Sequence, residues 1–182
     1  MNRIKRFFLK KEEKEMKKFF DSQLEAYARK MEFEITACKR RYDLMNRAFY
    51  LFPKGYITGV AQNQNEEVII VHNEPGTAFY LISQTNQGAC YLPRIFYKCY
   101  YNYSCEFPKV FIQLVDVITV EDNIGNGSIL MEALIEYAKR IKATEITGSL
   151  SPVDDDHADR RNHFYEKFGF KIEGRKITLN LI

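Results

Sequence analysis

Gly125 and Gly127, in the stretch DNIGNGS at residues 122–128, stand between an apolar run and a segment with helical periodicity. Glycine is costly inside a helix and poor in a strand, so two glycines here indicate that something approaches the backbone closely. The first N–H groups of a helix have no partner within it, and the helix dipole adds partial positive charge. A strand, a glycine turn and a helix start therefore predict a binding site for an anion such as phosphate.

Two common phosphate-binding motifs do not fit this turn. The P-loop pattern GxxxxGK[ST] requires a lysine and a spacing that the turn lacks. The dinucleotide fingerprint GxGxxG requires a small third residue, where this chain has Leu130. A glycine turn that serves packing alone remains open as an alternative.

Residues 108–182 resemble the GNAT family, the GCN5-related N-acetyltransferases. Their acetyl-CoA motif, (Arg/Gln)-x-x-Gly-x-(Gly/Ala), follows a strand and opens a helix, and residues 122–127 fit both glycine positions. About forty residues further on, residues 164–175 (FYEKFGFKIEGR) are similar to the family's second motif, whose usual form is close to YEKxGF. Asp122 departs from the family pattern, which has Arg or Gln there, and a carboxylate near a pyrophosphate is unfavourable unless it points away.

The resemblance implies an α/β fold of the GNAT type, with a mixed central sheet flanked by helices and an N-terminal helical segment. It implies a single domain over residues 1–182, in which residues 1–50 are basic and mainly helical and residues 108–182 form the acetyl-CoA-binding core. The implied function is transfer of an acetyl group from acetyl-CoA, the co-substrate, to an amine acceptor by direct attack in a ternary complex. The alternative is a GNAT-fold module that binds CoA or a protein partner without catalysis.

The resemblance also assigns roles to individual residues. Cofactor contacts fall at the end of the strand before the glycines and in the turn itself: Val117, Thr119, Asp122, Asn123, Ile124, Gly125, Asn126, Gly127 and Ser128. Tyr165 falls on the tyrosine that commonly acts as general acid on the leaving thiolate, which suits a phenol; a packing tyrosine is the alternative.

The general base is not evident from the sequence. If the strand before the glycines alternates regularly, Phe111, Gln113, Val115 and Val117 share one face, and none of them is a base. Asp116, Glu121 and His157 are candidates by proximity alone, and a water relay is a further alternative.

The elements that must position these residues follow from hydrophobic periodicity. Residues 67–71 and 78–83 predict a hairpin, and residues 110–119 predict a strand buried on both faces. Residues 129–142 predict a helix, 145–150 a strand, 159–168 a short helix and 170–181 one or two strands. This order predicts a central sheet flanked by helices. The Tyr-rich segment 91–103 is either a wall of the acceptor pocket or an aromatic strand.

An apolar row at steps of three and four predicts a helix over residues 11–31: Met16, Phe20, Leu24, Tyr27 and Met31. Beyond it, residues 31–35 alternate like a strand. Residues 1–50 carry 14 Lys or Arg against 8 Asp or Glu, which is typical of a solvated helix face and leaves nucleic-acid binding as a third hypothesis. The apolar row must be buried, either on the rest of the domain or on a second copy of the chain.

The composition bounds the other possibilities. The 182 residues suffice for one domain. No apolar stretch of about 18 residues or secretion signal is evident, so neither a membrane nor export is expected. The four cysteines form no CxxC pair and no zinc spacing with the three histidines, which predicts no metal and free thiols in a reducing cytoplasm. The identity of the amine acceptor and the oligomeric state stay open.

Overall fold

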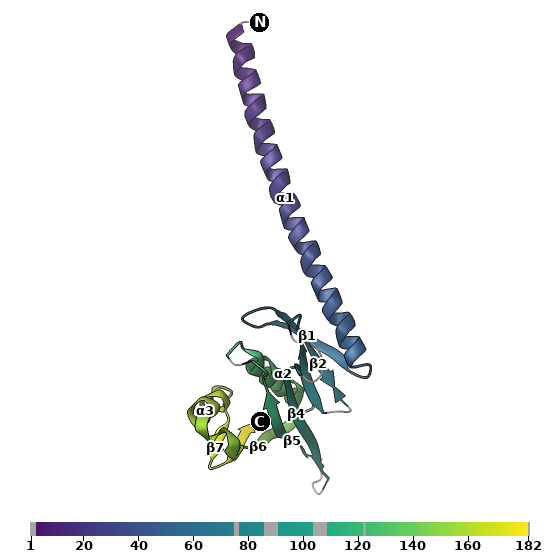
Figure 1. The fold of residues 1–182 in the computed structure, drawn as a ribbon, viewed down its shortest axis with the longest axis vertical. Coiled ribbons are helices and arrows are strands. Elements are labelled where there is room, and N and C mark those ends of the chain that lie inside the picture. Colours follow the sequence, from purple (N-terminus) through teal and green to yellow (C-terminus); the bar gives the residue numbers. More distant parts are fainter. Residues whose placement is uncertain (1–2, 75–76, 86–90, 104–108, 122, 182) are drawn as a thin grey trace. The chain divides into compact units, whose positions relative to one another are not determined.

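The computed structural model describes residues 3–74, 77–85, 91–103, 109–121 and 123–181; side chains are described except at residues 3–9, 11 and 153–155. The chain divides into two compact units, Met1–Asp43 and Leu44–Ile182. The first consists of most of helix α1 (Arg3–Leu51), whose last two turns belong to the second unit. Figure 1 shows α1 and the sheet of the second unit.

The second unit is built on one eight-stranded sheet in the order β1-β2-β3-β4-β5-β6-β8-β7. The strands are β1 (Tyr56–Gln62), β2 (Glu67–Asn73), β3 (Ala78–Ile82), β4 (Arg94–Asn102), β5 (Lys109–Ile118), β6 (Ala143–Ser149), β7 (Lys171–Glu173) and β8 (Lys176–Asn180). The helices are α2 (Asn126–Arg140) and α3 (Ala158–Lys167), and a 3-10 helix, η3 (Pro152–His157), precedes α3.

The sheet is mixed. Strands β5 and β6 are parallel, whereas each other described pair is antiparallel. Parallel neighbours need a crossover, and α2 provides it. The predicted fold class, a mixed central sheet with helices and an N-terminal helical segment, is therefore confirmed, as is the hairpin of β2 and β3.

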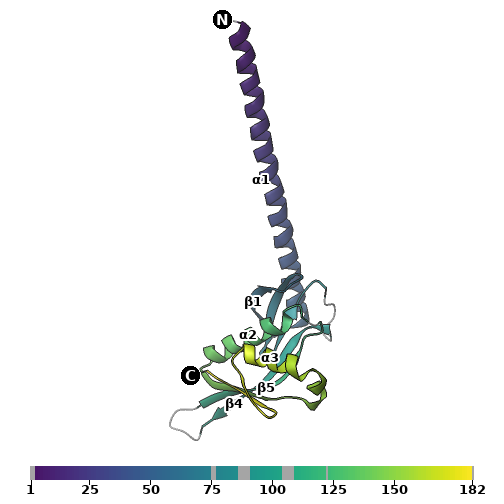
Figure 2. The same ribbon diagram turned by 90° about the vertical axis from the view of Figure 1, so that its left-hand side faces the viewer.

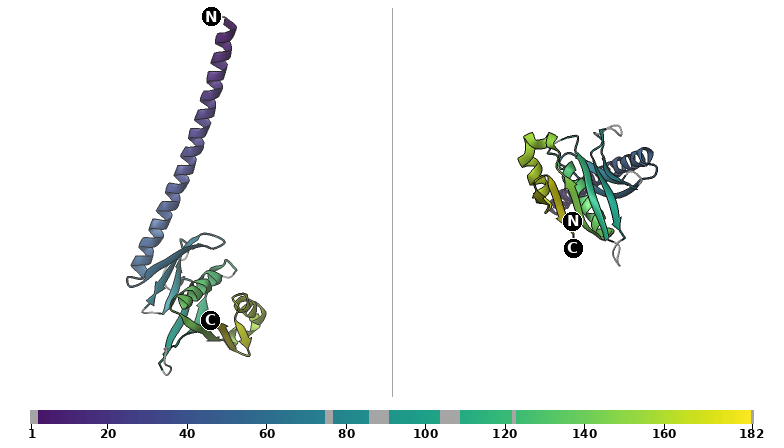
Figure 3. Two further views of the ribbon diagram at one scale, coloured as in Figure 1. Left: turned by 180° about the vertical axis from the view of Figure 1, so that it is seen from behind. Right: turned by 90° about the horizontal axis from the view of Figure 1, so that it is seen from below.

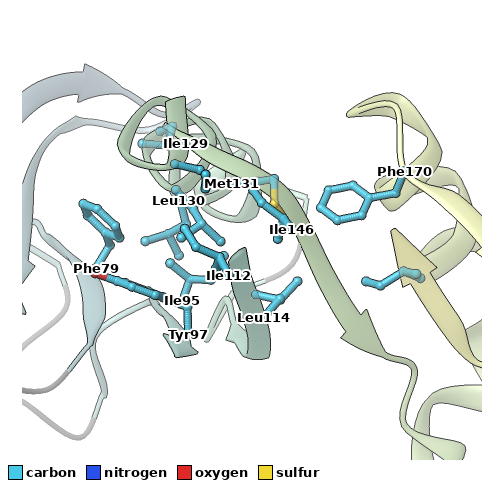
Figure 4. Packing of buried hydrophobic residues seen from close by; sticks show 14 of the residues in the cluster. Phe79, Ile95, Tyr97, Ile112, Leu114, Ile129, Leu130, Met131, Ile146 and Phe170 are labelled. Atoms are coloured by element: carbon cyan, nitrogen blue, oxygen red, sulfur yellow. The ribbon is translucent and has the colours of Figure 1, made fainter. Parts of the chain in front are cut away.

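The main core lies between α2 and the sheet. The apolar residues of α2 recur at helical spacing, so one face of α2 packs across β3 to β6 (Figure 3). Its buried side chains, which include Leu130, Met131 and Leu134, meet Ile112 of β5 and Ile146 of β6 (Figure 4). This packing fixes the direction in which α2 leaves the end of β5.

A second cluster joins the end of α1 to strands β2 and β3. Leu44, Ala48 and Phe52 follow one another at intervals of four residues, and each is buried against apolar residues of the sheet such as Ile69 and Val71. The helix ends at Leu51, two residues before Pro53, which cannot continue a helix without losing a hydrogen bond.

Several local predictions were wrong. Residues 31–35 continue α1, because an alternation of five residues is too short to separate a strand from a helix whose apolar row runs on. Strand β5 is not buried on both faces: Ile112 and Leu114 are buried, but Val115 is 50% exposed. Strand β1 was not predicted at all.

The regular alternation expected along β5 was also wrong. Leu114 faces Tyr97 and Asp116 faces Phe96, which leaves Val115 as an extra residue in a β-bulge. Val117, opposite Ile95, therefore packs on the same core cluster as Leu114 instead of sharing the other face with Phe111. The Tyr-rich segment forms β4 with only Tyr97 of its tyrosines buried, so it is a strand and does not line the cavity described below.

His72 is fully buried in a group of aromatic side chains. Its ring stacks on Phe79 with centroids 4.3 Å apart, and its two nitrogens are hydrogen-bonded to the hydroxyls of Tyr56 and Tyr97. Burial, with a smaller contribution from the positive charge of Arg140, lowers the pKa of His72 from 6.5 to about 4. The imidazole is therefore neutral in the folded protein at neutral pH.

The depressed pKa of His72 predicts that the fold loses stability in mild acid. The unfolded chain binds the proton below pH 6.5 and the folded chain only below about 4, so the loss develops between these values. The shift corresponds to roughly 3 kcal/mol of unfolding free energy. Urea unfolding at pH 7.5, 5.5 and 4.5 measures this loss of unfolding free energy. In His72→Gln the unfolding free energy should depend less on pH. In the control His163→Gln, at an exposed histidine, the pH dependence should be unchanged. Parallel curves for His72→Gln and the unchanged protein would contradict the prediction.

Candidate functional site

A cavity of about 430 Å³ opens beside the end of β5. Stretches distant in sequence line it: the end of β5 with the turn that follows it into α2, the end of β6, and helix α3 with His157 before it, while Ile177 of β8 completes the lining. Most of the residues singled out by sequence meet there: Val117, Thr119, Asn123, Gly125, Asn126, Gly127, Ser128 and Tyr165. Ile124 does not line the cavity, and Asp122 lies outside the described residues.

The cavity begins where the two parallel strands separate. The ladder between β5 and β6 pairs Val110 with Ala143 and ends at Leu114 and Gly148, although β5 continues to Ile118. Beyond that point β5 pairs with no described strand but β4, so the edge that faced β6 is turned to the cavity. An edge of this kind offers backbone N–H and C=O groups to a ligand.

The turn after β5 presents the N-terminus of α2 to the cavity. Gly125 is the N-cap residue, with φ of 94° in the left-handed region, and no side chain caps the helix. The first helical hydrogen bond runs from the Ile129 N–H to the Gly125 carbonyl, so the preceding N–H groups have no partner within the helix. No acidic residue lies in the first turn, which leaves the positive end of the helix dipole uncompensated there.

At Gly127 a side chain is disfavoured by close neighbours and not by the backbone angle φ. A Cβ at this position would lie 3.2 Å from Cγ2 of Thr119 and 3.3 Å from Cε2 of Phe164. The turn therefore packs tightly between the end of β5 and α3, and Figure 2 views the structure from the side on which α3 lies. At Gly127 the close approach comes from the protein itself, whereas a Cβ at Gly125 would meet no protein atom within 4 Å.

Asn126 lines the cavity and holds an unpaired, buried donor. Its side chain is buried, its Oδ1 accepts from Nδ2 of Asn63 at 3.0 Å, and its Nδ2 has no hydrogen-bond partner. The orientation of Asn63 is fixed because its Oδ1 accepts from the N–H groups of Asn65 and Glu66 at 2.9 and 2.7 Å. Asn126 therefore cannot reverse its amide without losing the bond to Asn63. A buried unpaired donor is costly, so this amide is a polar group that the described residues leave unsatisfied.

The turn between β1 and β2 supports the glycine turn from behind. The Ile124 carbonyl accepts a hydrogen bond from the Gln64 N–H at 3.0 Å. Gln64 directly follows Asn63, whose side chain is bonded to Asn126, so the two turns are joined at two neighbouring residues. Asn63 was not among the residues singled out by sequence, because a polar residue in the run QNQNE looks like any turn residue.

Helix α3 brings positive charge to the cavity. Arg160 and Arg161 line it, and Arg161 donates to the Ser151 carbonyl at 3.0 Å. Lys167 donates to Oγ of Ser128, in the first turn of α2, at 3.1 Å. These cations favour an anionic ligand near the helix N-terminus.

Tyr165 reaches the cavity from α3 with its ring held by neighbours. The ring makes edge contacts with Phe164 and Phe170, at centroid distances of 5.2 and 5.6 Å. All three candidate bases line the same cavity, namely Asp116, Glu121 and His157, and all three are exposed.

The fold and the cavity define a mixed α/β protein in which an uncapped helix N-terminus and a separating pair of parallel strands share one pocket. Among the described residues, no group of three His, Cys, Asp or Glu side chains is arranged to hold a metal ion. Within the same residues, no helix has the length and apolar character needed to cross a bilayer. Cys38 and Cys99 are free thiols, and Cys90 and Cys105 lie outside the described residues.

No protein-family model matches the chain. Part of it is similar to the uncharacterized protein YocC of Bacillus subtilis (strain 168). The two are 42% identical over 50 residues, which is 28% of this chain and 30% of that relative's length.

Two solved structures match part of the chain. The NatC complex bound to Gag peptide and CoA matches with a TM-score of 0.48 and 15% identity, over 59% of this chain and 73% of that chain. A mutant AtaT toxin bound to the C-terminus of the antitoxin AtaR and acetyl-CoA matches with a TM-score of 0.33 and 9% identity, over 63% of this chain and 67% of that chain. Both TM-scores lie below 0.5, so the function rests on the geometry of this chain's own cavity.

Proposed function

We propose that the chain is a GNAT-type N-acetyltransferase that uses acetyl-CoA as co-substrate and acetylates an amine. One observation carries the proposal: the free edge of β5, the uncapped N-terminus of α2 and Tyr165 line a single cavity. A site that uses acetyl-CoA needs three features. It needs an anion site for the pyrophosphate, an extended backbone edge for the pantetheine arm and a proton donor for the leaving sulfur. The two motifs that resemble the GNAT family supply the first and the third.

The pyrophosphate would be held by the start of α2. The N–H groups of Asn126, Gly127 and Ser128 and the unpaired Nδ2 of Asn126 offer donors that fit phosphate oxygens. Lys167 and Arg160 add positive charge from α3. The cations compensate for the absence of the Arg or Gln that the family has at the position of Asp122.

The pantetheine arm would pair with the free edge of β5. Val117 and Thr119 lie beyond the last β6 partner, and both line the cavity. The Val117 N–H would polarise the thioester carbonyl, since a fixed donor stabilises the charge that develops there during attack.

The chemical step forms a bond from the amine nitrogen to the acetyl carbon and breaks the carbon–sulfur bond. Asp116, Glu121 or His157, directly or through water, would take the proton of the ammonium. Tyr165 would donate its phenolic proton to the leaving sulfur, and the second proton that the nitrogen loses as the amide forms would restore the phenol through solvent. All three candidate bases line the one cavity, which supports each of them equally as the proton acceptor.

Two measurements on the full chain test the function. Titration calorimetry with acetyl-CoA should show binding at a single site, and release of free thiol should follow when a panel of small amines, polyamines and peptides is added. Binding without thiol release from any amine would favour the non-catalytic CoA-binding module. Absence of binding would overturn both functions.

Asn63→Asp is expected to weaken acetyl-CoA binding by about tenfold or more, since a hydrogen bond to a charged group contributes roughly 1.5–3 kcal/mol. The new carboxylate would still accept from the two backbone N–H groups, but its other oxygen would draw the Nδ2 of Asn126 away from the ligand. Calorimetry measures the change. Asn65→Asp, which places the same charge on an exposed residue two positions on, is the matched control and should bind normally. Equal affinities for the two variants would remove Asn126 from the site.

A further inference from the structure

The first unit carries an apolar row that is exposed along its whole length. The members of the row are Met16, Phe20, Leu24, Tyr27, Met31, Ile35, Cys38 and Tyr42. Among the large ones, the exposed fraction ranges from 38% at Met31 to 67% at Leu24. A soluble surface rarely keeps such a row open to water.

The spacing of the row has a regular period. Its steps are four, four and three residues, which add to a repeat of eleven: Met16, Tyr27 and Cys38 are equivalent, as are Phe20, Met31 and Tyr42. Eleven residues in three turns correspond to about 3.67 residues per turn, close to the 3.6 of a straight α-helix. The row therefore stays on one side of α1 and suits pairing with another helix in a coiled coil.

The other sides of this segment are polar. Arg29 and Glu25, and Lys30 and Glu34, form exposed ion pairs at i,i+4 spacing beside the row. Phe19 and Phe33 are exceptions, since they lie off the row and are 59% and 74% exposed. One apolar stripe on a charged helix indicates one covered side, not a helix buried all round.

The size of the row matches a specific interface. Each large apolar side chain exposes on the order of 100 Å² at these exposed fractions, or roughly 700 Å² for the row. Two such rows facing each other would bury about 1,400 Å², within the range of stable protein interfaces. An isolated helix gains little from propensity alone, so burial of this row is what would hold the segment helical.

We propose that residues 16–42 of α1 pair with the same segment of a second copy of the chain. The row is self-complementary, because in an antiparallel pair centred near Arg29 each large ring faces a slimmer side chain. The facing residues are then Phe20 and Cys38, Tyr27 and Met31, and Tyr42 and Met16. In a parallel pair each residue meets its own copy. Both arrangements bury the same row, and neither depends on the function of the cavity.

Light scattering after size exclusion tests the pairing on the full chain. The unchanged protein should have twice the 21.5 kDa mass of one chain. Leu24→Asp removes an apolar residue from both partners and should raise the dissociation constant by about 100-fold or more, which gives a monomer at micromolar concentration. Ser22→Asp adds the same charge to the far side of the helix and should stay a dimer. Acetyl-CoA affinity should be the same in all three proteins.

Cys38 reports the orientation of the pair. In a parallel, in-register pair, mild oxidation should link Cys38 of one copy to Cys38 of the other; in an antiparallel pair, the link should appear only when Phe20→Cys is introduced opposite it. Either link supports the pairing. A monomeric unchanged protein, or a Leu24→Asp variant as dimeric as Ser22→Asp, would overturn it.

Discussion

Tyr165→Phe should lower turnover with acetyl-CoA by about 10²–10⁴-fold, the usual contribution of a general acid. Phenylalanine keeps the ring and its contacts with Phe164 and Phe170, so the fold and the affinity for acetyl-CoA should be unchanged. Thiol release at saturating amine measures the loss, at a pH where chemistry limits the rate.

The control for this prediction is Tyr91→Phe. Tyr91 is 66% exposed and does not line the cavity, so its variant should turn over normally. A loss well below tenfold in Tyr165→Phe would return Tyr165 to a packing role. Retained binding with no loss of thiol release would point to water as the proton source for the leaving sulfur.

Gly125→Val should weaken acetyl-CoA binding by at least about tenfold, because two effects combine at this residue. The φ of 94° is one that a β-branched residue adopts only with strain, on the order of 1–3 kcal/mol. A Cβ would also project into space that holds no protein atom within 4 Å, where the ligand is expected. Calorimetry on the folded variant measures the affinity.

Gly174→Val separates these two effects. Gly174 has φ of 61° and equally open space around its Cβ, but it lies between β7 and β8 and does not line the cavity. Both variants should lower the melting temperature, and only Gly125→Val should weaken binding. Unchanged acetyl-CoA affinity in a folded Gly125→Val protein would sink the proposed anion site.

The order of elements in the second half of the chain could be predicted from sequence because its signals are local. The apolar run of β5, the 3.6-residue period of α2 and the short helix predicted over residues 159–168 each arise within one element. The two glycines were visible for the same reason, since a backbone conformation that excludes side chains leaves its mark on residue type.

The separate reasons for the two glycines were not visible in the sequence. Gly125 is favoured by its own φ, a local property, whereas a Cβ at Gly127 would crowd Thr119 and Phe164, which lies on another helix. Only the packing of α3 against the turn decides that second case. The bulge at Val115 likewise depends on how β5 pairs with β4, and it moved Val117 from one face to the other.

The N-terminal segment shows the limit of local patterns most clearly. Its alternation at residues 31–35 pointed to a strand, yet the row that continues through Ile35 and Tyr42 makes it one helix with the residues before it. The row by itself predicts that one side of α1 is covered by a partner.

Sequence alone determined which residue types at the candidate site could hold an anion and give up a proton. Tertiary structure decided that Asn126 and Tyr165, from two different helices, line one cavity. It also placed Asn63 behind Asn126, where it occupies the Oδ1 of that amide and leaves the Nδ2 without a partner. The physical reason is that contacts between distant elements set which buried polar groups are satisfied and which are left for a ligand.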